Sequence, residues 1–142
     1  MTQRFEGLSL AQFKRLAATT GRTLRHQPAA IGLIGPLGAG KTTFVKNFAR
    51  SLGIKKIKSP TFTIINNFRL GGRQLYHIDF YRLSKQSELK PLGVPELLKQ
   101  KTDLILIEWL DKFPALKKSC DLIINISFAK NADERNITIY KN

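Results

Sequence analysis

The stretch GPLGAGKTTF, residues 35–44, decides the fold because it matches the phosphate-binding loop pattern G-x-x-x-x-G-K-[ST]. It follows an apolar run, AAIGLI at residues 29–34, and precedes a segment at 41–52 with the pattern of a helix. A strand, a glycine-rich loop and a helix in this order favour a nucleotide site over an ordinary turn. The sequence therefore predicts an α/β fold of the P-loop NTPase type.

The residues of the loop predict its contacts with a nucleotide. Glycines allow a backbone conformation that turns successive N–H groups toward one anion, and the start of the next helix adds its own N–H groups. The Lys41 side chain is expected to bridge the β- and γ-phosphates, and the Thr42 hydroxyl to bind Mg²⁺. Two interpretations of Thr43 stay open, contact on the α-phosphate side or a hydroxyl that faces its own helix. The predicted nucleotide-binding residues of the loop are Gly35, Gly38, Ala39, Gly40, Lys41, Thr42 and Thr43.

Composition predicts one P-loop domain over residues 1–142. The chain is 42% apolar, and no apolar run approaches the length of a membrane span, so no membrane partner is expected. The first residues, MTQRFEGLSLAQF, contain no apolar stretch typical of a secretion signal, and the single cysteine, Cys120, cannot form an internal disulfide. These features predict a cytoplasmic protein.

Charge is the second unusual feature of the sequence. The chain has 24 Lys and Arg residues against 10 Asp and Glu residues, a formal net charge of +14. This balance favours a polyanionic partner such as RNA, bound in a salt-dependent way, although a solvated basic surface is an equal alternative. No zinc spacing or helix-turn-helix signature indicates a sequence-specific nucleic-acid module.

The segments around the loop predict a mixed sheet with flanking helices. Ser9 and Gln12 form a capping box that opens a helix through about Ala18, and Gly53 is expected to close the helix that follows the loop. A Gly71-Gly72 turn predicts a hairpin. The sum is a parallel core with antiparallel hairpins, not a doubly wound sheet. The expected strands are 29–34, 62–70, 73–81, 103–109, 121–128 and 135–141, with short helical pieces over 85–100 broken at Pro91 and Pro95.

Two carboxylates are placed to serve a nucleotide site. Glu108 ends the apolar run LILIE, and at the carboxyl end of a core strand it is expected to hold a water on Mg²⁺ or to orient the attacking water. Asp79 ends LYHID and is the only acid between Glu6 and Glu88. A single acid in such basic surroundings predicts that Asp79 pairs with a metal or a lysine near the phosphates. An ordinary salt bridge is the alternative.

Three other features stay ambiguous from the residues alone. His77 is interpreted as a packed or hydrogen-bonded imidazole rather than a catalytic base. Trp109 must point away from Glu108 if the strand continues, and packing is as good an explanation as function. The segment SPTFT, residues 59–63, is either a switch that senses the γ-phosphate or the plain start of a strand.

With these motifs in place, the chain resembles the TsaE family, formerly called YjeE, of small bacterial P-loop ATPases. The family is needed for the threonylcarbamoyladenosine modification of tRNA. Five segments carry the resemblance, in order and spacing within residues 33–114: GPLGAGKTTF, SPTFTI, LYHIDFYRL, ELKPLGVPELL and IEWLDKFP.

The resemblance implies roles for residues in four of these segments. Lys41 and Thr42 bind ATP and Mg²⁺, Thr61 belongs to a switch-like segment, and Asp79 is essential. Glu108 fills the Walker B role beside the metal, and Trp109 lies near the nucleotide. ATP, or its product ADP, and Mg²⁺ are the implied cofactors.

The resemblance also implies partners. Members of the family work with TsaB and TsaD, and ATP hydrolysis supports turnover of the complex in which TsaD transfers the threonylcarbamoyl group to tRNA. Contact with tRNA is expected to be indirect, although the basic charge leaves direct contact open. Pro36 departs from the family's usual acidic or polar residue, so it cannot make the interaction of such a side chain, while the backbone cradle is expected to survive.

Three other functions are weighed against the ATPase. A small-molecule kinase shares the loop but needs an acceptor pocket and usually clustered arginines, which the sequence after residue 60 does not offer. A nucleic-acid-binding module with a regulatory nucleotide site would fit the charge. A GTPase is disfavoured because no N-K-x-D motif occurs.

Overall fold

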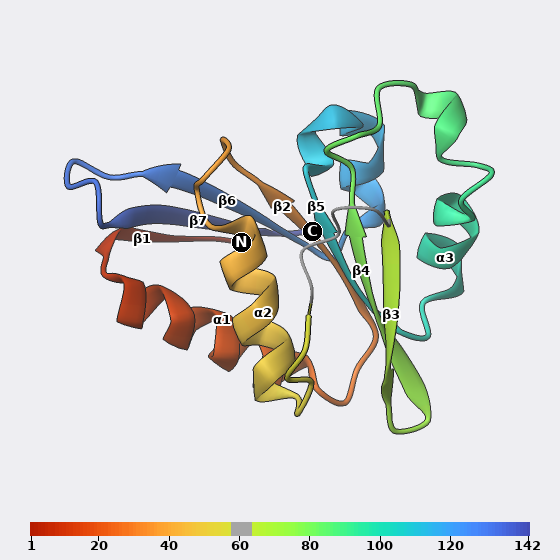
Figure 1. Cartoon of the computed structure of the whole chain (residues 1–142), viewed down its shortest axis with the longest axis horizontal. Coiled ribbons are helices and arrows are strands. Elements are labelled where there is room, and N and C mark those ends of the chain that lie inside the picture. Colours follow the sequence, from red (N-terminus) through yellow and green to blue (C-terminus); the bar gives the residue numbers. More distant parts are fainter. Residues whose placement is uncertain (58–63) are drawn as a thin grey trace.

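Across residues 1–57 and 64–142, the part of the chain that the computed structural model describes, seven strands form one sheet (Figure 1). The strand order is β1-β7-β6-β2-β5-β4-β3. Thr61 and the rest of the segment SPTFT lie outside the described residues. The strands are β1 (Thr2–Leu8), β2 (Ala29–Ile34), β3 (Ile65–Leu70), β4 (Arg73–Asp79), β5 (Leu104–Glu108), β6 (Leu122–Phe128) and β7 (Arg135–Lys141).

The sheet has a parallel centre and antiparallel edges, which confirms the predicted mixed α/β fold. Strand β2 pairs in parallel with β5 and β6, and β4 pairs in parallel with β5. The pairs β3–β4, β6–β7 and β1–β7 are antiparallel. Every residue of β5 and nearly every residue of β2 is buried, because both strands have neighbours on each side and are covered on both faces. Their continuous apolar sequences reflect this position.

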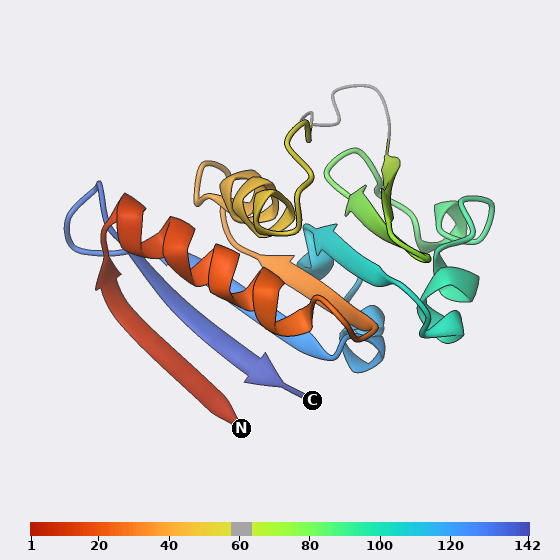
Figure 2. The same ribbon diagram turned by 90° about the horizontal axis from the view of Figure 1, so that it is seen from below.

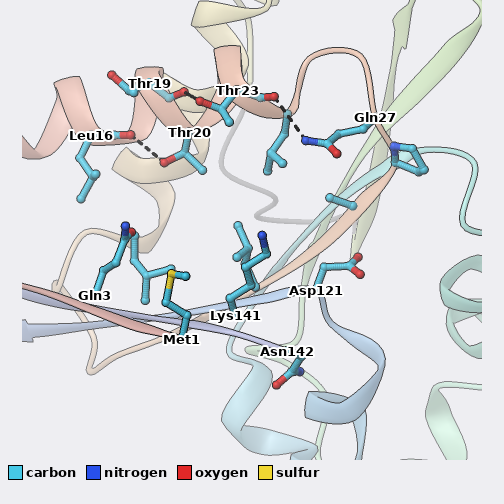
Figure 3. A pocket seen from close by; sticks show the side chains of 15 residues that line it. Met1, Gln3, Leu16, Thr19, Thr20, Thr23, Gln27, Asp121, Lys141 and Asn142 are labelled. Atoms are coloured by element: carbon cyan, nitrogen blue, oxygen red, sulfur yellow. Dashed lines mark hydrogen bonds between the residues drawn. The ribbon is translucent and has the colours of Figure 1, made fainter.

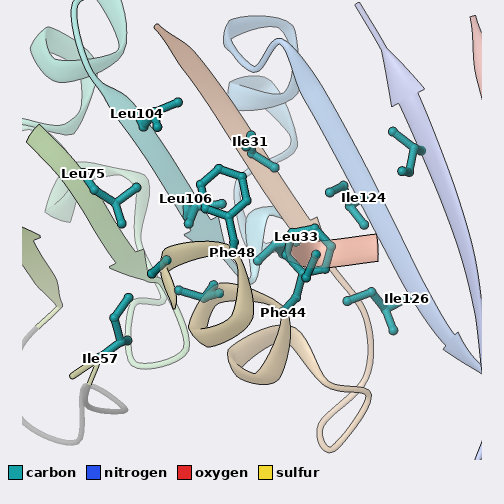
Figure 4. Packing of buried hydrophobic residues seen from close by; sticks show 14 of the residues in the cluster. Ile31, Leu33, Phe44, Phe48, Ile57, Leu75, Leu104, Leu106, Ile124 and Ile126 are labelled. Carbon is teal, nitrogen blue, oxygen red and sulfur yellow. The ribbon is translucent and has the colours of Figure 1, made fainter. Parts of the chain in front are cut away.

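Two helical layers cover the two faces of the sheet (Figure 2). On one face, α1 (Leu10–Leu24) and α2 (Lys41–Ser51) pack on side chains of the central strands. Figure 4 shows Phe44 and Phe48 of α2 among the aliphatic side chains of β2, β5 and β6. The other face carries α3 (Val94–Gln100) and the 3-10 segments Gln86–Glu88, Leu110–Lys112 and Pro114–Ser119. No helix in the described ranges is long and apolar enough to cross a membrane.

Helices α1 and α2 cross in close contact at Gly21. A Cβ atom placed on Gly21 would lie 2.3 Å from the Ser51 Oγ and 2.7 Å from the Phe48 carbonyl oxygen. Only a residue without a side chain lets the two backbones approach so closely. The crossing therefore makes α1 and α2 one continuous layer beside the phosphate-binding loop.

The structure corrects the predicted helices in two places. Helix α1 continues to Leu24, well beyond Ala18, although its second half, TTGRTL, contains residues of modest helix propensity. Packing against α2 at Gly21 explains the extension. Pro95 does not break a helix, because it lies in the first turn of α3, where its missing N–H costs no hydrogen bond. The predicted Gly53 closure is confirmed, with φ of +90° directly after Leu52, the C-cap of α2.

The structure also corrects the predicted strands. The sequence reasoning missed β1, an edge strand with mostly exposed residues that is formed by its antiparallel pairing with β7. Strand β4 ends at Asp79, two residues earlier than expected, and β5 ends at Glu108. Trp109 takes a left-handed conformation with φ of +61°, so the strand does not continue through it.

Candidate functional site

The loop at residues 35–40 connects the end of β2 to the start of α2 and has the backbone that the motif predicts. Gly38 and Gly40 have φ of +80° and +116°, values that a residue with a side chain rarely adopts. Gly40 is the N-cap of α2, and no side chain caps the first turn. Pro36 is exposed, and its carbonyl accepts a hydrogen bond from the Ala39 N–H at 3.0 Å. The loop thus has the glycine backbone that the motif predicts and accommodates Pro36, and the first turn of α2 has no side-chain cap on its N–H groups.

Lys41 lies across the inside of this loop. Its side chain is only 5% exposed, and Nζ donates to the carbonyls of Gly35 and Pro36 at 2.5 and 3.0 Å. Burial lowers the pKa of Lys41, while the negative charge of Glu108 and, more weakly, of Asp111 and Asp79 opposes that shift. The ammonium group is thus held at the centre of the loop, near the carboxylates that end the neighbouring strands.

Glu108 is clamped at both carboxylate oxygens. The Thr42 hydroxyl donates to Oε1 at 2.6 Å, and His77 Nε2 donates to Oε2 at 3.0 Å. Glu108 is 1% exposed and His77 is fully buried, so this pairing lies inside the protein. Burial favours a higher pKa for Glu108, but the hydrogen bonds from His77 and Thr42, with the charges of His77 and Lys41, together lower it. The interpretation of His77 as a hydrogen-bonded imidazole is confirmed.

Asp79 lies directly beside Glu108 in the sheet. The two residues are register partners at the carboxyl ends of parallel strands β4 and β5. Asp79 is half-buried, and its Oδ1 accepts the Tyr81 N–H at 2.9 Å. Burial raises the pKa of Asp79, the adjacent Glu108 charge raises it further, and the bond from Tyr81 opposes the change. Two carboxylates therefore lie side by side at the carboxyl ends of β4 and β5.

Trp109 turns toward the loop instead of following β5. Its ring lies beneath Lys41, with Nζ 3.8 Å from the ring centroid, a cation–π contact. The Tyr81 ring packs beside it at a centroid distance of 5.3 Å. The expectation that Trp109 points away from Glu108 depended on a continuing strand. The left-handed backbone at Trp109 removes that condition and brings the indole to the predicted site.

Arg135, which the sequence reasoning did not select, braces the loop from β7. Its Nε donates to the Ala39 carbonyl at 2.8 Å, and Nη2 donates to the Gly38 carbonyl at 3.3 Å. The same guanidinium packs over the Phe128 ring. No local motif marks Arg135, because the residue lies 96 positions from Ala39 and meets it only through the sheet.

A cavity of about 570 Å³ lies away from this loop, between α1 and the strands β1 and β7 (Figure 3). It contains none of the predicted site residues. The hydroxyls of Thr20 and Thr23 face it but donate to the carbonyls of Leu16 and Thr19 in their own helix. Both hydroxyls are therefore already hydrogen-bonded within α1.

The groups gathered at the loop suit a phosphate ligand and a hard divalent cation. Backbone N–H groups and Lys41 match phosphate oxygens, while the Thr42 hydroxyl and Glu108 carboxylate provide adjacent oxygens of the kind that Mg²⁺ prefers. Among the described residues, no cluster of three His, Cys, Asp or Glu side chains could hold a metal. This is compatible with Mg²⁺, which commonly takes one or two protein oxygens and completes its shell with phosphate and water.

Comparison with known families matches residues 8–137 to the model described as "Threonylcarbamoyl adenosine biosynthesis protein TsaE". The tRNA threonylcarbamoyladenosine biosynthesis protein TsaE of Treponema pallidum is 35% identical over 127 residues, which cover 88% of this chain and 90% of that protein. The proteins of the same name from Haemophilus influenzae and Bacillus subtilis are 37% and 45% identical, over 75% of this chain in each case. The matched regions span slightly less than two thirds of those two relatives, 66% and 65%.

Among solved structures, the fold matches the crystal structure of YdiB from Bacillus subtilis. The TM-score is 0.75 and the sequence identity is 32%, with 99% of this chain and 86% of that chain covered. The similarity therefore extends beyond the loop to the whole sheet and its helices.

Proposed function

The chain belongs to the TsaE family of threonylcarbamoyl adenosine biosynthesis proteins, and on that premise we propose that it binds and hydrolyses ATP in support of tRNA modification. TsaB and TsaD are its proposed protein partners, and ATP or ADP with Mg²⁺ its proposed ligands. The family does not favour the alternatives of a small-molecule kinase or a nucleic-acid module with a regulatory nucleotide site. A cytoplasmic location goes with this proposal.

One observation carries the proposal: the Thr42 hydroxyl lies 2.6 Å from the Glu108 carboxylate at the mouth of the loop. These residues are 66 positions apart in sequence, and they are the two whose oxygens serve Mg²⁺ in P-loop NTPases. Lys41 lies in the same loop with its charge held among backbone carbonyls. A glycine-rich turn with a merely structural role needs neither the lysine nor the carboxylate.

Each residue then has a proposed role. Gly35, Gly38, Ala39 and Gly40 line the phosphates, and Thr42 and Thr43 continue these contacts into α2. The Ala39 N–H, which donates to the Pro36 carbonyl, exchanges that bond for one to phosphate when it takes part. Lys41 exchanges its bonds to the loop carbonyls for bonds to the β- and γ-phosphates. Mg²⁺, when bound, neutralises charge that develops on the phosphates during their cleavage.

The two carboxylates have separate proposed roles. Glu108 is the catalytic carboxylate, which orients the attacking water or a water on Mg²⁺, and His77 fixes its orientation through Oε2. Asp79 joins Glu108 at the end of the adjacent strand. With Thr61, it is proposed to respond to the γ-phosphate and to transmit the nucleotide state to TsaB and TsaD.

Partner dependence tests this proposal. We expect slow phosphate release by the chain alone and a severalfold increase when TsaB and TsaD are added, because the response to ATP is read by the partners. Asp79→Ala should lose this stimulation more than it loses ATP affinity. Asp79→Asn is the matched control for local structure, since its amide oxygen still accepts the Tyr81 N–H while the charge is removed. Equal rates with and without partners, in a preparation shown to form the complex, would contradict the switch role.

Trp109 should report nucleotide binding through its fluorescence. Its ring contacts Lys41, so movement of the ammonium group toward phosphate would change the surroundings of the indole. Trp109 is the only tryptophan, which makes the emission spectrum specific to this site. We expect a saturable change on titration with ATP and Mg²⁺, and no such change in Lys41→Ala. An emission spectrum of the unaltered chain that stays constant at saturating ATP would leave Trp109 with a packing role only.

A further inference from the structure

The solvent-exposed side of helices α1 and α2 carries lysine and arginine side chains and no aspartate or glutamate. Residues 7–78, which include both helices, contain no Asp or Glu, although the chain has 10 acids in total. The exposed basic side chains of the two helices and the α1 C-cap form what we call the basic face. Its members are Lys14, Arg15, Arg22, Arg25, Lys46 and Arg50.

The basic residues of α1 share one side of that helix. At 3.6 residues per turn, Lys14, Arg15, Arg22 and Arg25 fall within a sector of about 100°. The opposite flank of α1, with Thr20 and Thr23, faces the cavity shown in Figure 3. Phe13 and Ala17 point into the core, and Gly21 touches α2, so the basic sector begins beside α2 and turns outward.

The basic residues of α2 extend the same surface. Lys46 and Arg50 are one turn apart and exposed, whereas Phe44, Val45 and Phe48 form the buried side of the helix. Because α1 and α2 touch at Gly21, their outward sides form one surface. None of the six side chains makes an ion pair with a carboxylate within the described residues. Their charge is therefore available to a partner.

The chemistry of the basic face fits a phosphate backbone better than a protein or a membrane. Protein interfaces concentrate buried aromatic anchors, and peripheral membrane helices carry exposed Trp, Phe or Leu. In the described part of the chain, the only large apolar side chain exposed on α1 or α2 is Leu10, at the first residue of α1. Lysine and arginine without apolar anchors are the groups that contact the phosphates of nucleic acids without selecting sequence.

We propose that the basic face binds the phosphate backbone of RNA, directly and independently of nucleotide at the loop. That the RNA is tRNA rests on the proposed function, whereas the backbone contact rests on the charge and geometry of α1 and α2. No residue of the proposed ATP site belongs to the basic face, so the two activities can be lost separately.

Binding of a labelled, unmodified tRNA transcript to the full chain, without ATP, tests this inference. The basic-face variant removes four charges with the substitutions Lys14→Gln, Arg15→Gln, Lys46→Gln and Arg50→Gln. Glutamine has a helix propensity close to that of lysine and arginine, so both helices are expected to remain folded. The matched control removes four exposed lysines elsewhere, with Lys90→Gln, Lys99→Gln, Lys117→Gln and Lys118→Gln, and therefore has the same net charge. Circular dichroism of both variants confirms that the helices are intact.

We expect the basic-face variant to bind tRNA roughly tenfold or more weakly between about 50 and 200 mM salt, and the control to bind nearly as the unaltered chain does. The slope of log affinity against log salt should flatten by about 0.7–0.9 for each phosphate that the variant no longer neutralises. Equal weakening in both variants would assign binding to net charge alone and overturn the proposal. Absence of tRNA binding by the unaltered chain would also overturn it. So would a basic-face variant that no longer binds phosphatidylserine vesicles but still binds tRNA as the unaltered chain does. ATP hydrolysis by the basic-face variant, measured in parallel, separates failure of this inference from failure of the proposed ATPase.

Discussion

Lys41→Ala should abolish ATP hydrolysis, with a loss on the order of 100-fold or more in turnover, and should weaken ATP binding. The Lys41 ammonium is held inside the phosphate-binding loop, where it donates to the carbonyls of Gly35 and Pro36. In the proposed role, its positive charge offsets repulsion between the β- and γ-phosphates and the charge that develops during cleavage. Alanine retains the helix but leaves that charge uncompensated.

The measurement is phosphate release together with equilibrium affinity for labelled ATP. Lys46→Ala is the matched control, because it removes a lysine from the same helix at an exposed position away from the loop. The control should retain both activities. Hydrolysis by Lys41→Ala at the rate of the unaltered chain would remove the site assignment.

Glu108→Gln should preserve ATP binding while removing turnover, again by on the order of 100-fold or more. In the proposed site the phosphate contacts come from the loop and Lys41, whereas Glu108 contributes a buried carboxylate that accepts the Thr42 hydroxyl and is not expected to bind phosphate. The glutamine amide has nearly the same shape, and its oxygen can still accept a hydrogen bond from Thr42. What the substitution removes is the negative charge needed to orient water or a metal-bound water.

A titration with labelled ATP and a single-turnover assay separate the two effects. Glu96→Gln makes the same chemical change at an exposed position in α3 and should leave both measurements unaltered. A Glu108→Gln protein that hydrolyses ATP normally would show that the carboxylate beside Thr42 is not catalytic.

The fold could be predicted where the signal is local. The β2 strand, the loop and the start of α2 follow from an apolar run, spaced glycines and helical periodicity within residues 29–52. Strand β1 could not, since its residues are mostly exposed and its pairing with β7 joins the two ends of the chain. The full length of α1 likewise depends on a tertiary contact at Gly21 rather than on propensity.

The candidate site likewise contains residues that local sequence patterns indicate and residues that only the tertiary structure brings into place. The positions of Lys41, Thr42 and Glu108 near one another were predictable, because the first two lie at the start of α2 and Glu108 ends β5. The carboxyl ends of parallel strands lie at one end of the sheet, beside the loop. The sequence indicated that His77 is a packed or hydrogen-bonded imidazole, but it could not identify Glu108 as the partner. Arg135 could not be anticipated, because its contacts with the loop arise from the order of β-strands.

Formation of threonylcarbamoyladenosine on tRNA by reconstituted complexes tests the central claim most directly. The assay combines TsaB, TsaD, tRNA and the activated threonylcarbamoyl donor with ATP and either the unaltered chain or Lys41→Ala. If ATP hydrolysis at this site supports turnover, the unaltered chain should give many products per complex. Lys41→Ala should give about one turnover or fewer, as should omission of the chain. Equal multiple-turnover yields from the unaltered chain and from a folded Lys41→Ala protein would contradict the account.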